Sequence, residues 1–443
     1  MTSSRADGER TVGVDGLSVL FLPLASLLTL LVIVSAWSGV PRLRGQLVAL
    51  FGLHSTFIGV FCALDMALFF TFWELMLIPS YFLIGSFGVG PERRRAAVRY
   101  VTYMLVGSAP VLLAIVLLAA SARGPQGAYA FDYVALLKTS LPPRLQTWIF
   151  FLLLFGFAVK GPLFPFHTWL PSTLMESPFG MGVMLVGVKL GAYGIIRFVL
   201  PLAPEASARH MGILSVLGAV GIVYAALIAL AQPNLRRMLA FSSVSHVGFV
   251  MVGLASMTHQ GMQGAVLQMI TMGLVSTGLL FAVGFLYSRL GTSDLSSMGG
   301  LAARAPVLTL FFFLIGLASI GLPGTAGFVG EHLILLGTFR ADWRVAAVAL
   351  LGVILGAAYF FRHFERAFLG PITRPSANAI RDLRPREILV LASLSVIILC
   401  AGIYPRPLAA VTDSSVRALT ARVRVSEGRA SPAAELSSLD LGK

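Results

Sequence analysis

Long apolar segments alternate with short polar ones along almost the whole chain. Many of the apolar segments have about the ~20 residues that an α-helix needs to cross a bilayer, and they carry few charges. The pattern therefore predicts an all-α, polytopic membrane protein with about twelve transmembrane helices. The predicted spans are 17–38, 46–64, 66–88, 97–120, 145–160, 181–203, 211–231, 236–257, 261–288, 306–322, 343–369 and 385–404.

Two of these helices run into sequences that break a helix. "GPLFP" at 161–165 follows the fifth span, and "GLPGTAG" at 321–327 closes the tenth. Short half-helices are expected after them, at about 166–176 and 327–338. A break at membrane depth leaves backbone polar groups unpaired, so it must face protein or a water-filled cavity.

The two breaks recur at matching places in the chain. If helices two to six form one repeat and helices seven to eleven another, each break follows the fourth helix of its half. Paired broken helices of this kind indicate inverted repeats with a central ion site. We therefore divide the chain into a polar N-terminal segment at 1–16, a membrane domain at 17–405 and a polar tail at 406–443, in which 408–423 is expected to form an amphipathic surface helix.

Composition supports a membrane protein and removes several other classes. Of the 443 residues, 57% are hydrophobic and 12% charged, against about 25% charged in soluble domains. The net charge of +14 does not indicate a nucleic-acid partner, because arginines collect in short loops between apolar segments. Cys62 and Cys400 lie far apart in apolar segments, so no disulfide framework, zinc site or iron–sulfur site is expected.

The loop arginines also predict an orientation. Loops with odd numbers hold Arg42, Arg44, Arg93, Arg94, Arg95, Arg99, Arg236, Arg237, Arg289, Arg304, Arg362, Arg366, Arg374, Arg381, Arg384 and Arg386. Loops with even numbers are expected to hold only Arg123, Lys138, Arg144 and Arg209. Because cytoplasmic loops are enriched in Lys and Arg, the odd loops are expected in the cytoplasm and both termini outside.

Four ionisable residues lie deep in apolar sequence. They are Glu74, Lys160, Lys189 and Glu331. Placing one Lys or Asp at the centre of a membrane helix costs about 2.5–3.5 kcal/mol, so such residues indicate a functional site. The alternative is a buried ion pair that only fixes helix register. A lysine suits proton transfer, because burial and a nearby carboxylate act on its charge in opposite directions.

A histidine extends this set of charges. His246 lies in "FSSVSHVGFV", beside hydroxyls that can hold water: Ser242, Ser243 and Ser245. A lone histidine in an apolar helix is usually a satisfied core residue, but the serines and the intramembrane charges favour a proton-transfer role here. His167 follows the first break and is expected to be a structural or gating residue.

Several stretches together resemble one known family. They are "FWELMLIPSYFLIGSFG", "FAVKGPLFPFHTWLP", "VKLGAYGIIRFVLPL", "LRRMLAFSSVSHVGFV", "SIGLPGTAGFVGEHLILLGTF" and, near the C-terminus, "DLRPREILVLASLSVIILCAGIYPRPL". These motifs are similar to those of the antiporter-like proton-channel subunits of respiratory complex I, and among them to the M-type chains of bacterial NADH–quinone oxidoreductase, equivalent to mitochondrial subunit 4. The resemblance covers about 12–410.

The resemblance implies a role for each charged residue. Glu74 corresponds to the glutamate of "FWE", which is paired in the family with the lysine that corresponds to Lys160. Lys189 corresponds to the central relay, His246 to the histidine of "SVSH", and Glu331 to the terminal residue of the channel. The implied function is proton translocation across the bacterial inner membrane, driven by redox chemistry in partner subunits.

The resemblance also implies the partners and cofactors. The chain would assemble with other membrane subunits in the lipid bilayer and hold no cofactor or metal itself, while FMN, iron–sulfur clusters and quinone belong to the partner subunits. Relatives that share the fold leave two alternatives open. One is a subunit of a Mrp-type cation/proton antiporter or of a membrane-bound hydrogenase, and the other is a scaffold subunit that pumps nothing.

Two departures from the family stand out. The family usually has fourteen helices, and this chain lacks counterparts of the first two, because its start aligns with the family motif at Gly13–Gly16. A misassigned start or a shortened form would explain that. The second relay histidine of the family is replaced by Met272, whose thioether carries no proton. Either water and hydroxyls such as Thr271 bridge the gap, or the path conducts poorly.

Overall fold

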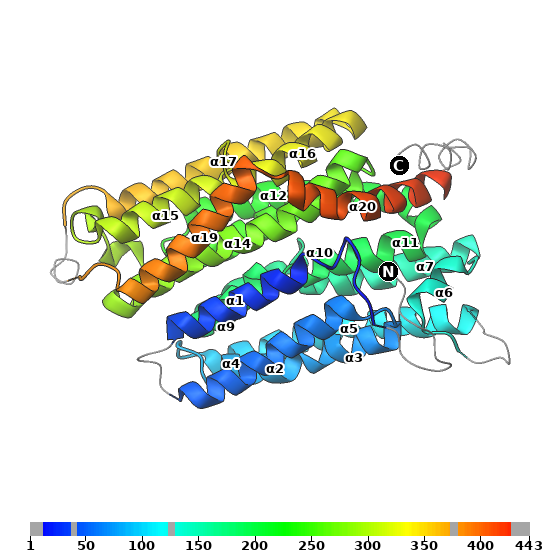
Figure 1. Cartoon of the computed structure of the whole chain (residues 1–443), viewed down its shortest axis with the longest axis horizontal. Helices are drawn as coiled ribbons and strands as arrows, with labels where there is room; N and C mark the ends of the chain where they lie inside the picture. The colour runs from blue at the N-terminus through cyan, green and yellow to red at the C-terminus, as the bar shows by residue number, and fades with distance from the viewer. Residues whose placement is uncertain (1–11, 37–41, 123–128, 373–379, 427–443) are drawn as a thin grey trace.

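The computed structural model describes residues 12–36, 42–122, 129–372 and 380–426, and these fold into packed α-helices (Figure 1). Within these ranges, β-structure is limited to three isolated bridges between loops. Nine helices or helix groups are long and apolar enough to span a membrane, and two shorter apolar helices accompany them in the described part of the chain. The predicted all-α membrane architecture is confirmed.

The helices follow the predicted spans closely. Their bounds are α1 Phe21–Ala36, α2 Leu43–Cys62, α3 Met66–Leu75, α4 Leu77–Gly85, α5 Arg93–Ser121, α6 Tyr133–Lys138, α7 Pro143–Lys160, α8 Trp169–Glu176, α9 Phe179–Gly187, α10 Leu190–Gly194, α11 Leu200–Leu202, α12 Pro204–Ala231, α13 Leu235–Ala255, α14 His259–Leu290, α15 Pro306–Ser319, α16 Ala326–Ala341, α17 Trp343–Phe368, α19 Pro385–Ile403 and α20 Arg406–Ser426. A π-helical turn, Ile195–Val199, joins α10 to α11.

The two halves of the chain lie side by side. Figure 1 shows α2 to α7 along one side of the molecule and α12 to α17 along the other. Helices α1 and α9 lie between them, and each of these two helices contacts α14 of the second half. In each half, the helix before the break contacts both parts of the broken helix: α5 contacts α7 and α8, and α14 contacts α15 and α16. This correspondence supports the predicted repeats.

Both predicted breaks are present. Helix α7 ends at Lys160 and α8 begins at Trp169, with Pro162 and Pro165 between them lacking the N–H that a helix needs. Helix α15 ends at Ser319 and α16 begins at Ala326. Two glycines in that gap adopt positive φ angles of 72° and 88°, which a side chain would disfavour. The predicted half-helices are therefore correct to within a few residues.

One predicted span is wrong in its continuity. The segment predicted as one helix at 181–203 is interrupted after Gly187, and α10 begins at Leu190. Val188 and Lys189 have non-helical backbone angles at this interruption. Lys189 therefore lies at a third break rather than inside a helix. The sequence has no proline at this point, so the break carries no composition signal.

The arginine-rich loops gather at one end of the bundle. Asn234 pairs with Asp294 across two of these loops, and Arg289 donates to the carbonyl of Arg381 in a third. Arg374 lies outside the described residues. The assignment of Arg236 to a loop is wrong: its side chain is buried, donates to the Ser177 carbonyl and lies over the Phe179 ring at 4.0 Å.

The opposite end of the bundle carries a smaller number of basic residues. Gly337 packs against Gly261 near the start of α14, so the turn between α16 and α17 lies at this end. This turn adds Arg340 and Arg344 to the four basic residues predicted for the even loops. The excess of basic residues at the first end is therefore smaller than predicted, but it remains.

Helix α20 lies across this second end and contacts α12 and α14. The expected amphipathic helix is present, with Val416 and Leu419 on its buried side. Gln263 of α14 donates to Thr412 at 2.6 Å, and His259 lies 2.9 Å from Asp413. The Arg417 guanidinium hydrogen-bonded to Asp413 holds the pKa of that carboxyl below its ordinary value. Residues 1–11 and 427–443, at the ends of the two predicted polar segments, lie outside the described residues.

Candidate functional site

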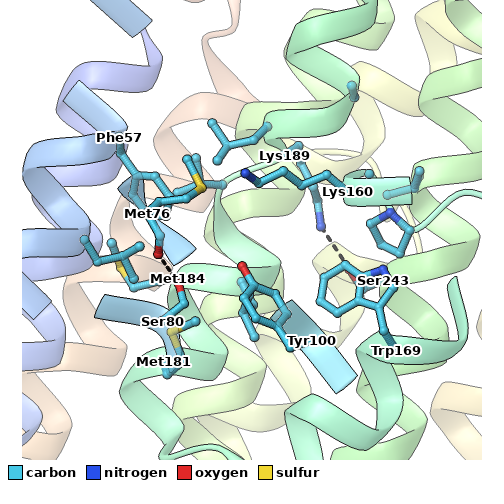
Figure 2. A pocket seen from close by; sticks show the side chains of 18 residues that line it. Phe57, Met76, Ser80, Tyr100, Lys160, Trp169, Met181, Met184, Lys189 and Ser243 are labelled. Carbon is cyan, nitrogen blue, oxygen red and sulfur yellow. Dashed lines mark hydrogen bonds between the residues drawn. The ribbon is translucent and has the colours of Figure 1, made fainter. Parts of the chain in front are cut away.

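Lys160 and Lys189 line one small cavity inside the bundle. Its volume is about 40 Å³, enough for a few water molecules at ~10–15 Å³ each. Ser243 and Tyr100 also line it, and most of the remaining wall is apolar. Figure 2 shows the Lys189 chain directed toward Ser243, while the Lys160 chain extends toward the Met76 side of the cavity. Two broken helices thus deliver one lysine each to the same space.

The two breaks touch through glycines. A methyl group at Gly191 would lie 2.3 Å from the Cα atom of Gly161, closer than Cβ atoms approach other atoms in proteins. Gly161 follows Lys160 directly, and Gly191 lies two residues after Lys189. Only glycines allow the backbones to meet at this distance, so these two positions set the spacing of the two lysines.

Lys160 is held by Trp73 of α3. Its ammonium group donates to the Trp73 carbonyl at 3.0 Å and lies 3.7 Å from the centroid of the indole ring. The Trp73 indole N–H in turn donates to Ser108 at 3.2 Å, which fixes the ring. A cation over a desolvated tryptophan face gains about 2 kcal/mol or more. The tryptophan of the "FWE" motif is therefore part of the site, a role that sequence reasoning missed.

Glu74 lies next to this arrangement without touching the lysine. No ion pair within 4.0 Å joins Glu74 to Lys160 in the described part of the chain. The carboxylate is half-buried, and its Oε1 atom has no hydrogen-bond partner among the described residues. The contacts of the Lys160 ammonium group come from Trp73, the residue before Glu74, rather than from the carboxylate.

Lys189 makes two hydrogen bonds from its break. The ammonium group donates to the Val186 carbonyl at 2.6 Å and to the Ser243 hydroxyl at 3.0 Å. The Val186 carbonyl is one that the interrupted helix leaves without its usual N–H partner. The break therefore supplies the acceptor that keeps this buried lysine in place.

A second, smaller cavity begins on the far side of Val186. Its volume is about 10 Å³, close to the minimum for one water molecule, and Ser242, His246, Ser276 and Ser319 line it. Ser242 also hydrogen-bonds with the hydroxyl of Tyr359 at 2.8 Å. Of the three serines around His246, Ser243 therefore lines the lysine cavity and Ser242 the second cavity, whereas Ser245 donates to the Ile222 carbonyl of α12.

His246 meets Glu331 in the second half. The Nδ1 atom lies 3.5 Å from the Glu331 Oε1 atom, and both side chains are buried. The angles are unsuited to a hydrogen bond, and neither ring nitrogen has such a partner among the described residues. Gln268 of α14 donates to the same Oε1 atom at 3.2 Å. Gln268 thus orients Glu331. The sequence around Gln268 did not indicate this role.

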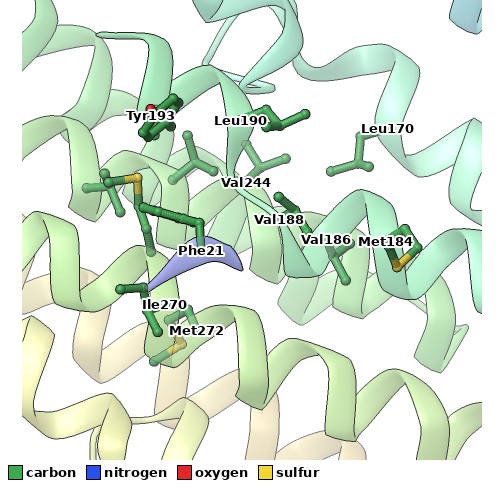
Figure 3. Packing of buried hydrophobic residues seen from close by; sticks show 14 of the residues in the cluster. Phe21, Leu170, Met184, Val186, Val188, Leu190, Tyr193, Val244, Ile270 and Met272 are labelled. Carbon is green, nitrogen blue, oxygen red and sulfur yellow. The ribbon is translucent and has the colours of Figure 1, made fainter. Parts of the chain in front are cut away.

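Met272 is buried in apolar surroundings. Figure 3 shows it close to Ile270 among the hydrophobic residues packed between the two halves. Only 1% of Met272 is exposed, and neighbouring Thr271 is buried with no hydrogen-bond partner for its hydroxyl within the described chain. The polar contact from α14 to Glu331 comes one turn earlier, from Gln268.

Two other buried polar residues lie apart from these cavities. His167 stacks against Phe164 at 5.9 Å between ring centroids, next to the first break. Arg197 was not singled out from the sequence, although it lies inside an apolar segment. It pairs with Asp15 of the N-terminal loop and lies 4.7 Å from the Tyr133 ring. The contacts of both residues are those of side chains that stabilise the fold.

The site contains acids, bases and hydroxyls but no set of metal ligands. No group of three or more His, Cys, Asp or Glu residues that could hold a metal ion occurs in the described ranges. Lys160 and Lys189 share one water-sized cavity with Ser243, and His246 lines a second cavity with Ser242, Ser276 and Ser319. Such an arrangement can pass protons between neighbouring groups.

Comparisons with known proteins agree with this geometry. The family described as "NADH:quinone oxidoreductase/Mrp antiporter, TM" matches residues 63–356. NADH-quinone oxidoreductase subunit M of Rickettsia typhi is 38% identical over 92% of this chain and 82% of its own length. The chain also superimposes on respiratory complex I from Thermus thermophilus with bound NADH (TM-score 0.86, 33% identity, 93% of this chain and 86% of that chain).

A Mrp complex from Dietzia has the same fold. Its TM-score is 0.82 with 21% identity, over 92% of this chain and 84% of that chain. At this identity the likeness concerns the fold alone. The higher identities above therefore carry the information on function.

Proposed function

The chain belongs to the membrane family shared by NADH–quinone oxidoreductases and Mrp antiporters, and from this premise we propose that it is an M-type, proton-translocating subunit of an NADH–quinone oxidoreductase. Other membrane subunits of such a complex are its partners. The observation that carries the proton-translocating role is the shared cavity in which two broken helices present Lys160 and Lys189 to the same water-sized space.

The proposed proton route crosses both halves of the molecule. A proton on Lys160 passes through water in the first cavity to Lys189, then along Ser243 and the serine-lined second cavity to His246. His246 delivers it to Glu331, whose carboxylate lies 3.5 Å away. Each step joins groups that can both accept and release a proton.

Glu74 sets when Lys160 holds its proton. A charged carboxylate nearby favours the charged ammonium, and movement of α3 relative to α7 would weaken that influence. A separation beyond ion-pair distance suits this role, because a direct ammonium–carboxylate pair in a dry interior would hold the proton too firmly. The driving force for such movement comes from partner subunits that carry the redox centres.

We assign this chain no redox chemistry of its own. Its role in the enzyme is that of a translocating subunit, with FMN, iron–sulfur clusters and quinone held by partners. The antiporter alternative is disfavoured, because the relatives at 33–38% identity are complex I subunits, whereas the Mrp likeness is 21%. The scaffold alternative is also disfavoured. Burying two lysines inside the membrane costs free energy, and a subunit that transports no protons would gain nothing from placing both at one cavity.

The test concerns Lys189. Lys189→Arg keeps a charge but cannot deprotonate, and Lys189→Ala removes the group. If Lys189 relays protons, both variants lose most proton uptake by inverted membrane vesicles, about a hundredfold for loss of a positioned acid–base group. Uptake is driven by NADH oxidation and normalised to the amount of assembled complex.

Lys138→Arg is the matched control, since Lys138 is exposed at the end of α6 and far from the cavity. This variant keeps full proton uptake. Full uptake by Lys189→Arg would instead show that the charge alone matters, which would reduce Lys189 to a residue that anchors helices. Full uptake by Lys189→Ala would remove it from the route altogether.

A further inference from the structure

A cavity much larger than the lysine cavity opens at the arginine-rich end of the bundle. Its volume is about 610 Å³, within the range of ~300–1,000 Å³ typical of ligand sites. It lies between the two halves, with walls from α1, α2, α4, α9, α14 and α19. We call this space the vestibule.

The vestibule is apolar inside and basic at its rim. Leu47, Leu50, Leu83, Phe281 and Phe285 form much of its wall. Three arginines line it as well: Arg42 before α2, Arg93 at the start of α5 and Arg386 at the start of α19. The arrangement matches an amphiphile that has an acyl chain and an anionic head.

The rim carries an excess of positive charge. Among the described residues that line the vestibule, Glu387 is the one acid, and Arg289 neutralises it at 2.5 Å. Helices α2, α5, α9 and α19 also begin at this rim, and their N-terminal N–H groups favour an anion. Basic pockets between membrane helices on the cytoplasmic side attract anionic lipid headgroups.

We propose that the vestibule binds one anionic phospholipid, with its phosphate among Arg42, Arg93 and Arg386 and an acyl chain along the apolar wall. The acyl chain of the lipid ends near Met181, which lines both the vestibule and the lysine cavity. The bound lipid therefore fills the gap between the two halves and separates the lysine cavity from water at this end.

The test uses the complete complex in nanodiscs of zwitterionic phosphatidylcholine. Phosphatidylglycerol with a photoreactive group on its acyl chain is titrated in, and crosslinked peptides are mapped by mass spectrometry. Crosslinks are expected in peptides covering residues 43–50 and 281–288, which line the vestibule. A phosphatidylcholine probe with the same acyl group is expected to crosslink there far less.

Matched triple variants isolate the rim charges. Arg42→Gln, Arg93→Gln and Arg386→Gln together are expected to raise the amount of phosphatidylglycerol needed for half-maximal crosslinking about a hundredfold, at about fivefold per arginine. Arg44→Gln, Arg94→Gln and Arg366→Gln change the net charge equally at exposed positions outside the vestibule and leave the titration unchanged. If the first triple fails to assemble, Arg93→Gln is compared with Arg94→Gln.

Three results would overturn the proposal. The first is equal crosslinking by the zwitterionic and anionic probes, which indicates an acyl groove without charge recognition. The second is an unchanged titration for the rim variants. The third is full competition by inorganic phosphate at millimolar concentration, which indicates a small-anion site. The relay residues are untouched in every variant, so failure of this proposal leaves the proposed proton route intact.

Discussion

Lys160 keeps its ammonium group between a backbone carbonyl and a tryptophan ring rather than against a carboxylate. A direct salt bridge in a dry interior is held so firmly that losing one partner costs about 3–5 kcal/mol. The carbonyl and ring hold the cation more weakly, and among the described residues Glu74 forms no ion pair with it within 4.0 Å. At the scale of single residues, this weaker hold supports the proposed role of Lys160 in proton exchange.

Glu74→Gln removes the charge and keeps the shape of the side chain. We expect coupled proton uptake to fall about a hundredfold while the complex still assembles, because Lys160 loses the group that favours its charged form. Glu74→Asp retains the charge and is expected to be milder. The measurement is NADH-driven proton uptake by inverted vesicles, with Glu365→Gln, at an exposed position of α17, as control. Normal uptake by Glu74→Gln would remove Glu74 from the mechanism.

Met272→His restores the titratable group that the family has at this position. The direct approach of His246 to Glu331 gives a route that bypasses position 272, so we expect proton uptake to stay within about twofold of the original. The buried, apolar surroundings of Met272 predict a cost in stability of about 1–3 kcal/mol for the polar ring. The thermal midpoint of the purified complex measures that cost. A several-fold gain in uptake would show that the route runs through position 272.

At the scale of elements, the interruptions of three helices position the chemistry. Lys160 ends α7, Lys189 precedes α10, and Glu331 lies in the second turn of α16 after its break. Each interruption frees backbone carbonyls, and Lys189 uses one of them. A continuous helix would have paired that carbonyl and left the buried ammonium group without its acceptor.

Gly191→Ala tests the contact between two of these breaks. The added methyl group would lie 2.3 Å from the Gly161 backbone, so the breaks must move apart at a cost of about 1–3 kcal/mol. We expect a lower thermal midpoint for the complex and a loss of proton uptake larger than the loss of assembled complex. Gly212→Ala is the control, because no atom lies within 4 Å of its added methyl group. Unchanged uptake in Gly191→Ala would show that lysine spacing tolerates the shift.

The sequence predicts the helices well because hydrophobic length decides them. Both proline-marked breaks were also predictable, since Pro162 and Pro323 lack the N–H that a regular helix needs. The third break was not, because "VGVKLGAYG" contains only residues that helices accept. Its cause is tertiary: Gly191 packs on Gly161, and Lys189 needs the Val186 carbonyl. The roles of Trp73 and Gln268 likewise depend on contacts across the bundle.

At the scale of the whole molecule, the two halves repeat one arrangement with different residues. In the first half, Glu74 on the second helix faces Lys160 on the broken helix. In the second half, His246 on the second helix faces Glu331 on the broken helix. Lys189, on the last helix of the first half, reaches Ser243 of the second half and joins them. Along the proposed route, the first pair consists of an acid followed by a base, and the second of a base followed by an acid. This alternation suits stepwise proton transfer.

The orientation of this whole arrangement in the membrane follows from its charge. We expect the arginine-rich end on the cytoplasmic side and α20 outside, because each loop arginine favours retention in the cytoplasm. Single cysteines report it: Arg95→Cys at one end and Arg417→Cys on α20 replace side chains that are 84% and 61% exposed. Cys62 and Cys400 are first changed to serine. A membrane-impermeant maleimide is expected to label Arg417→Cys in right-side-out vesicles and Arg95→Cys in inverted ones. The reverse pattern would place the arginine-rich end and the vestibule outside and contradict the expected orientation.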